Sequence, residues 1–172
     1  MIKKKLYGGT FKEQLIASAN DRLVNFSLAR GTVRGVMVNG TRMINEMRAN
    51  HELGVLETLV LGRAYLGVGL MAANLKGKDR IGLQIECTGP IKGLSVEGNA
   101  FGEVRGYLKQ VPIPIEKPLE SFDLSPFLGA GFLSVTRFLE DAKYPFTGKV
   151  ALMYGNVAKD LAYYALTSEQ IP

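Results

Sequence analysis

Few side chains in this sequence have the type and spacing that catalysis or metal binding requires. The 172 residues contain one cysteine and one histidine. Cys87 has no second cysteine or histidine at ligand spacing, so we interpret it as a small buried residue. His51 falls near a predicted helix C-terminus, where a cation is favourable, and we interpret it as a surface residue. The adjacent Glu140 and Asp141 are typical of a solvated loop. The sequence therefore predicts no catalytic centre, no cofactor site and no metal site in this chain, and we do not expect an enzyme.

Two glycine patterns resemble nucleotide-binding motifs. Residues 67–72 (GVGLMA) match the glycine spacing of a dinucleotide fingerprint, which requires a strand directly before it. These residues instead fall inside a predicted apolar helix, so we interpret the glycines as positions of close packing. Residues 76–78 (KGK) lack the upstream glycine and the following Ser or Thr of a phosphate-binding loop, and they predict a turn.

The positive charge of the chain is concentrated near its N-terminus. The net charge is +5, and residues 1–50 carry nine Lys or Arg against three acidic residues. A surface that binds nucleic acid usually adds exposed aromatic side chains or a recognisable module. The aromatic residues instead cluster in the second half of the chain, so we interpret the basic stretch as a solvated arm and expect no nucleic-acid partner. A basic RNA-binding module, whose affinity would fall steeply with salt, stays open as an alternative, as does another α+β module that binds a small molecule.

The first half of the chain predicts a hairpin and two helices. Residues 23–29 and 33–38 alternate well enough for two antiparallel strands, with a turn at residues 30–32. Thr41 is predicted to cap a helix that runs toward Glu52. The expected stop of this helix is Gly54.

The most apolar segment of the chain follows this helix. Residues 55–75 contain only two charged side chains, and their apolar residues run almost all round a helix, which predicts a helix buried by its neighbours. Its uncharged part, residues 64–75, is too short to cross a bilayer, so we expect no membrane span. The absence of a secretion signal and of a cysteine pair for an internal disulfide predicts a cytoplasmic protein.

The second half predicts an antiparallel meander, followed by an irregular connection at residues 109–128 that holds four of the seven prolines. A last helix is expected at residues 156–167. Strands that meet in hairpins, with helices in separate blocks, favour an α+β fold. We expect residues 1–172 to form one domain, in which antiparallel sheets of hairpins and a meander pack with a long buried helix and flanking helices. The strands predicted in this half cover residues 81–86, 94–96, 104–107, 131–138 and 148–153.

Several short motifs follow one another in a characteristic order along residues 21–172. They include the runs at residues 61–64 (LGRA), 102–107 (GEVRGY) and 144–150 (YPFTGKV). In this order they resemble the redox-regulated thirty-three-kilodalton heat-shock chaperone family. The positions that carry the resemblance and are expected to be structural are Gly62, Arg63, Lys76, Gly77, Gly89, Pro90, Arg105, Gly106 and Tyr107.

The resemblance implies an ATP-independent holdase chaperone core that binds unfolding proteins and prevents their aggregation under oxidative or heat stress. Its partners would be unfolded client proteins and a second copy in a homodimer. In this family a C-terminal switch domain holds zinc through four cysteines, so zinc is expected only in that domain, which lies outside these residues. Cys87 stands where the family usually has an acidic residue, and Lys92 replaces a common glycine. We therefore do not interpret Cys87 as a switch cysteine.

A holdase needs exposed apolar surface that tolerates many partners. Loop aromatics and flexible methionines fit this requirement, although packing in the core is an alternative for each of them. The candidates for client binding are Met43, Met47, Phe122, Phe127 and Phe132.

Overall fold

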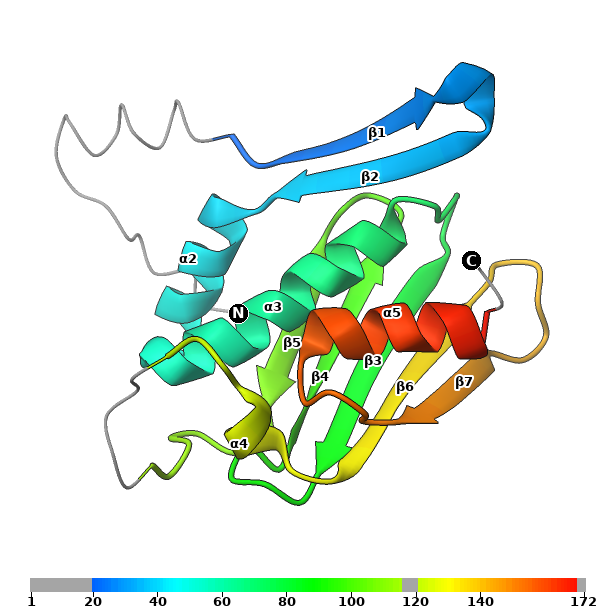
Figure 1. Ribbon diagram of the computed structural model, residues 1–172. Coiled ribbons are helices and arrows are strands. Elements are labelled where there is room, and N and C mark those ends of the chain that lie inside the picture. Colours follow the sequence, from blue (N-terminus) through cyan, green and yellow to red (C-terminus); the bar gives the residue numbers. More distant parts are fainter. Residues whose placement is uncertain (1–19, 116–120, 170–172) are drawn as a thin grey trace, which may run out of the picture.

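A five-stranded antiparallel sheet forms the body of the protein. The computed structural model describes residues 20–115 and 121–169, and the strand order is β5-β4-β3-β6-β7. Two helices, α3 and α5, lie on one face of this sheet (Figure 1). The predicted α+β class with antiparallel sheets is confirmed. The strands are β3 (Arg80–Cys87), β4 (Gly93–Asn99), β5 (Val104–Leu108), β6 (Gly131–Phe138) and β7 (Phe146–Ala151).

The alternation of apolar and polar residues decides which face of the sheet is buried. In β3 the side chains of Ile81, Leu83 and Ile85 are buried, while the residues between them are more exposed. Leu83 pairs with Val96 of β4 on one side and with Val135 of β6 on the other, so apolar residues of adjacent strands share this face. The predicted meander β3-β4-β5 is confirmed.

The helix α3 (Val55–Ala72) runs across the buried face of the sheet. It is apolar on nearly all sides, as the sequence predicts, but it ends three residues earlier than expected. By length and composition it could cross a membrane, yet 61% of this segment is buried inside the protein, as in the core helix of a folded domain. Gly67 lies against Leu161 of α5 (Val157–Thr167), and Gly69 lies against Val38. The prediction that these glycines serve close packing is confirmed.

A separate two-stranded sheet precedes this body. The strands β1 (Arg22–Leu28) and β2 (Val33–Asn39) pair in register from Arg22 opposite Asn39 to Leu28 opposite Val33. A short 3₁₀ turn, η1 (Ala29–Gly31), joins them one residue before the predicted turn. Figure 1 shows that the hairpin lies beyond α3, on the side away from the five-stranded sheet.

The ends of α2 (Thr41–Asn50) differ from the prediction. Gly40, not Thr41, occupies the N-cap position, and the backbone N–H groups of Arg42 and Met43 in the first turn are bound by the carboxylate of Asp21. A local cap is not needed because a distant carboxylate satisfies the same donors. Gly54 is not the stop of α2 but the N-cap position of α3.

Two further predictions differ from the structure, one in the bounds of a strand and one in a short helix that was not expected. Strand β7 begins at Phe146 and ends at Ala151, about two residues before the predicted span, because Asp160 binds the segment that follows it. The fully buried carboxylate of Asp160 accepts hydrogen bonds of 2.9 Å from the backbone N–H groups of Met153, Tyr154 and Asn156. The connection at residues 109–128 also contains a short helix, α4 (Ser125–Leu128).

We expect two glycines of the sheet to respond differently to substitution. A Cβ atom at Gly106 would lie 2.4 Å from the backbone oxygen of Ser95, whereas one at Gly82 would meet nothing closer than 3.8 Å. Gly106→Ala should lower the free energy of unfolding by about 1–3 kcal/mol, because backbone atoms have to shift. Gly82→Ala should leave it within about 1 kcal/mol of the unmodified chain. Urea unfolding followed by circular dichroism measures both, and equal effects would contradict the described packing.

Candidate client-binding surface

Apolar side chains cover the side of the hairpin that faces away from the body. We call Val24, Phe26, Leu28, Val33 and Met37 the hairpin face. Directly opposed residues share one side of a sheet, and here Val24 lies opposite Met37 and Leu28 opposite Val33. Their exposed fractions run from 41% for Phe26 to 61% for Met37. These exposed apolar side chains make the hairpin face a candidate interaction surface.

The opposite side of the hairpin packs toward α3. Val38 lies 3.8 Å from the position that a Cβ atom would occupy at Gly69, so the missing side chain lets strand and helix approach closely. On the hairpin face, the ring of Phe26 lies over Gly35, its cross-strand neighbour, and fills the space that a side chain would take. An isolated two-stranded hairpin is only marginally stable, so these contacts and the anchor at its base are needed to hold it.

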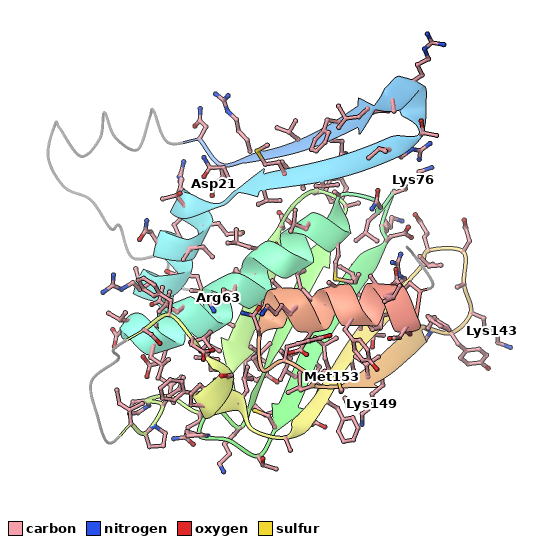
Figure 2. All side chains as sticks on the ribbon, in the orientation of Figure 1. Asp21, Arg63, Lys76, Lys143, Lys149 and Met153 are labelled. Carbon is pink, nitrogen blue, oxygen red and sulfur yellow. The ribbon has the colours of Figure 1, made fainter. Side chains whose placement is uncertain are left out.

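Asp21 anchors the base of the hairpin to α2. Its two carboxylate oxygens accept hydrogen bonds from the backbone N–H groups of Arg42, at 2.9 Å, and Met43, at 2.6 Å. A negative charge is favourable at a helix N-terminus, where it also satisfies donors that have no partner within the helix. Figure 2 places Asp21 at the junction of β1 and α2. The carboxylate therefore joins the start of the hairpin to the start of the helix.

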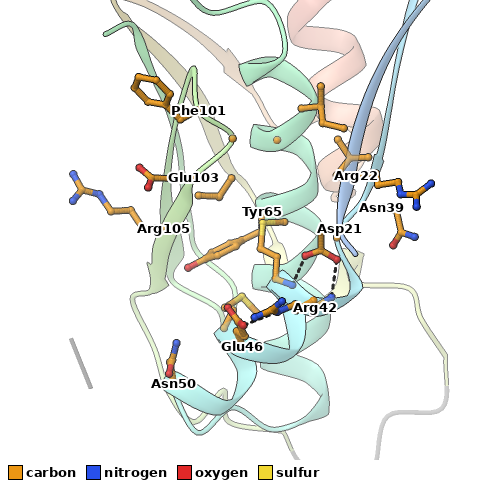
Figure 3. Close-up of a pocket in the computed structure, with 18 of the residues that line it drawn as sticks. Asp21, Arg22, Asn39, Arg42, Glu46, Asn50, Tyr65, Phe101, Glu103 and Arg105 are labelled. Atoms are coloured by element: carbon orange, nitrogen blue, oxygen red, sulfur yellow. Dashed lines mark hydrogen bonds and ion pairs between the residues drawn. The ribbon is translucent and has the colours of Figure 1, made fainter. Parts of the chain in front are cut away.

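A groove of about 670 Å³ lies beside this anchor. Figure 3 shows it between the hairpin base, α2, α3 and the β4–β5 turn. On its α3 side, the hydroxyl of Tyr65 donates a hydrogen bond of 3.2 Å to the backbone oxygen of Gly106, and burial raises the pKa of Tyr65. On the turn, Phe101 is 78% exposed, and the side chain of Asn99 accepts hydrogen bonds from the backbone of Phe101 and Glu103. The turn is thus fixed while its aromatic side chain faces solvent.

The groove does not have the arrangement of a catalytic site. His51 lines it and is half-buried at the C-terminal end of α2, so its prediction as a surface residue is only partly met. Arg42 forms an ion pair with Glu46 at 2.9 Å, so the charge of each side chain is balanced by the other. Cys87 lies elsewhere, at the end of β3, and burial raises the pKa of its thiol, so little thiolate forms at neutral pH.

Zinc does not fit the described residues. Across residues 20–115 and 121–169, no group of three or more His, Cys, Asp or Glu side chains is placed to hold a metal ion. The whole chain has one cysteine, and a structural zinc site needs four ligands, most often thiolates and imidazoles. No step of the function is therefore assigned to a metal in this chain.

The residues proposed from sequence for client binding lie in different places. Phe122 is 69% exposed, and its backbone oxygen accepts a hydrogen bond of 2.8 Å from the guanidinium of Arg63. Phe132 is 49% exposed, but it lies on the far face of the sheet beneath the ammonium group of Lys149. These two side chains do not adjoin the hairpin face and form no common surface with it.

The other three proposed residues pack against the core. Met47 is only 4% exposed, so its interpretation as an exposed client contact was wrong for this structure: it lies on the side of α2 that meets the core. Met43 and Phe127 are half-buried against the same core. The hairpin face was missed because alternation predicts a strand but does not say which side of it is covered. The signal in the sequence was the presence of apolar residues at both alternating sets of positions in residues 33–38, which are VRGVMV.

The positions that carry the family resemblance are mainly structural. Gly77 has a positive φ of 53° in the turn after α3, beside Lys76, so the turn prediction is confirmed. A Cβ atom at Gly89, before Pro90, would clash with the backbone of residues 127–128. Gly62 packs against Ile44. On the far face of the sheet, Arg105 pairs with Glu97 at 3.3 Å and Tyr107 is exposed.

Comparison with known proteins defines the class of this chain. A 33 kDa chaperonin of Thermus thermophilus is 39% identical over 155 residues, which cover 88% of this chain and 45% of that protein. A 33 kDa chaperonin of Prochlorococcus marinus is 39% identical over 158 residues, covering 88% and 52%. The crystal structure of the 33 kDa chaperonin of Thermotoga maritima matches with a TM-score of 0.79 at 38% identity and covers 86% of this chain and 51% of that one. All three relatives are named 33 kDa chaperonins, so the class is that of the chaperones.

Residues 21–172 match the sequence profile of the family described as Hsp33 protein. The chain belongs to the Hsp33 family. It spans about half the length of the curated relatives that it matches. The resemblance stated from the sequence is confirmed at the level of the family.

We expect Asp21 to control how firmly the hairpin is attached. Asp21→Ala removes the acceptor of two backbone N–H groups and should lower the free energy of unfolding by about 0.5–2 kcal/mol. It should also speed hydrogen exchange in the first turn of α2 and in β1, because the two are joined through this carboxylate. Hydrogen exchange read by mass spectrometry measures the effect, with Asn45→Ala as the control, since the side-chain amide of Asn45 donates to the backbone oxygen of Thr41 within α2. Unchanged exchange in β1 would contradict the anchoring role.

Proposed function

We propose that this chain acts as an ATP-independent holdase, which binds unfolding proteins and prevents their aggregation under oxidative or heat stress. The observation that carries the proposal is the hairpin face, because it presents five apolar side chains on an element held away from the body. Unfolding proteins expose apolar side chains of their own, and their contact with this surface would remove both from water. Such attraction is roughly proportional to area and not directional, which suits partners of many sequences.

The proposal requires no nucleotide and no metal in this chain. Residues 67–72 are part of α3, and residues 76–78 form a turn, so neither glycine pattern provides a phosphate site. The family's redox switch needs four thiolates, and one cysteine cannot supply them. We therefore assign no redox step to residues 1–172. A cytoplasmic location and a homodimer stay predictions.

A second candidate function rests on charge. The hairpin carries Arg22, Arg30 and Arg34 and no acidic residue, which would attract a nucleic acid. The outward side chains between these arginines are mostly aliphatic, however, and cannot stack on bases. Holdase activity is therefore the function that this surface supports better.

We expect substitutions on the hairpin face to weaken the suppression of aggregation. The variant Leu28→Ser, Val33→Ser, Met37→Ser removes apolar surface without adding charge. Light scattering of a thermally unfolding client should then require at least about tenfold more chain for the same suppression, which corresponds to a loss of about 1.4 kcal/mol in binding.

The matched control is the variant Val55→Ser, Leu166→Ser, which removes side chains that are about 60% exposed elsewhere on the molecule. It should suppress aggregation as well as the unmodified chain does. Equal loss in both variants would contradict the assignment to the hairpin, and no suppression by the unmodified chain at a stoichiometric amount would overturn the proposed function itself.

A further inference from the structure

Two turns meet at one end of the five-stranded sheet. One turn, residues 76–79, leads from α3 into β3, and the other, residues 139–145, connects β6 to β7. Arg80 and Phe138 form the last pair of the β3–β6 ladder and lie directly beside these turns. The two turns are therefore neighbours in space although they lie far apart in the sequence.

Each turn supplies a carboxylate that accepts a hydrogen bond from the backbone of the other turn. Asp79 accepts one of 2.9 Å from the N–H group of Glu140, and Glu140 accepts one of 3.2 Å from the N–H group of Lys78. Asp79 also accepts a bond of 3.4 Å from the N–H group of Lys76 in its own turn. Hydrogen bonds with an ionised acceptor are stronger than neutral ones. We call the reciprocal pair of Asp79 and Glu140 the carboxylate clamp.

Gly77 leaves room for this clamp. Its φ of 53° lies in the left-handed region that favours glycine. A Cβ atom at this position would lie 2.8 Å from Oε2 of Glu140, which is the oxygen that binds Lys78. A larger residue would therefore strain the turn and push the carboxylate of Glu140 away from its backbone donor. The contact gives this position, which carries part of the family resemblance, a role beyond the turn itself.

The backbone bonds of the clamp matter more than its ion pair. The ammonium group of Lys78 lies 3.3 Å from Oε1 of Glu140, but 83% of the Lys78 side chain is exposed to solvent. Exposed ion pairs contribute little, because water and salt screen them. The bonds to N–H groups instead fix the backbone of both turns.

We propose that the carboxylate clamp makes the two turns one conformational unit, which opens and closes as a whole. Groups that share one hydrogen-bond network are energetically coupled, so loss of either carboxylate should also weaken the bond that the other one accepts. A change in the β6–β7 connection is thereby transmitted to the turn that follows α3. The inference concerns coupling within the fold and does not depend on the proposed function.

The test measures the exchange of backbone amides with solvent by NMR on the full chain. It uses amides whose own acceptor is still present: Lys78 in the variant Asp79→Ala, and residue 140 in the variant Glu140→Ala. Rates are corrected for the effect of each new side chain on an unprotected amide. If the turns open as one unit, each of these amides should exchange at least about fivefold faster than in the unmodified chain.

Two outcomes of this measurement would overturn the inference. Exchange within about twofold of the unmodified chain at both amides would show that the turns open independently. A response at only one of the two amides would also contradict the clamp, because coupling between two sites is reciprocal.

A third variant opens the clamp without removing a carboxylate. Gly77→Ala should displace Glu140 and speed exchange at the amide of residue 140, although the carboxylate of Asp79 that binds this amide is unchanged. It gives the same test if one of the other variants does not fold, which circular dichroism checks. Unchanged exchange at residue 140 in Gly77→Ala would overturn the inference.

Two matched controls remove a charge but leave the backbone bonds of the clamp in place. Glu46→Ala removes a carboxylate that is paired with Arg42 within α2, and Lys78→Met removes only the ammonium group of the clamp. Both should leave exchange at residue 140 within about twofold of the unmodified chain. A larger effect of Lys78→Met would assign the coupling to the ion pair, and a larger effect of Glu46→Ala would show general loosening. Either result would overturn the clamp as described.

Discussion

The helix α3 has 18 residues and is apolar on nearly every side, so the other elements of the chain have to cover it. The five-stranded sheet covers one side of it, α5 packs at Gly67, and α2 packs at Gly62. β2 approaches the remaining side at Gly69, where Val38 makes the contact. The end of β2 thus packs the hairpin against the body, and the apolar residues of the hairpin face stay outside the core.

This arrangement links stability to function. Most apolar side chains of the sheet are buried against α3, whereas those of the hairpin face are not. Asp21 and Val38 hold the hairpin without covering it, one by hydrogen bonds to α2 and the other by contact with α3. Burying the hairpin face would strengthen the fold but would remove the surface proposed for clients, a conflict that is common at functional sites.

Local patterns in the sequence predicted the elements well and their surroundings less well. The period-two alternation of residues 81–86 and the all-round apolarity of α3 depend on near neighbours, and both predictions are confirmed. The predicted cap of α2 was wrong because the actual acceptor, Asp21, lies 21 residues before Arg42 in the chain. Met47 was proposed as a client contact, yet it is buried, because the side that a helix buries depends on where its neighbours lie. The same limit hid the hairpin face, although the strands themselves were predicted.

The central claim is that clients are held at the hairpin face. The most direct measurement is photo-crosslinking to a heat-unfolding client from a benzophenone amino acid placed at Met37 or, in a second variant, at Tyr144. Both side chains are well exposed, but Tyr144 lies in the β6–β7 connection. The account predicts that client crosslinks form mainly from position 37. Equal or greater crosslinking from position 144 would contradict it.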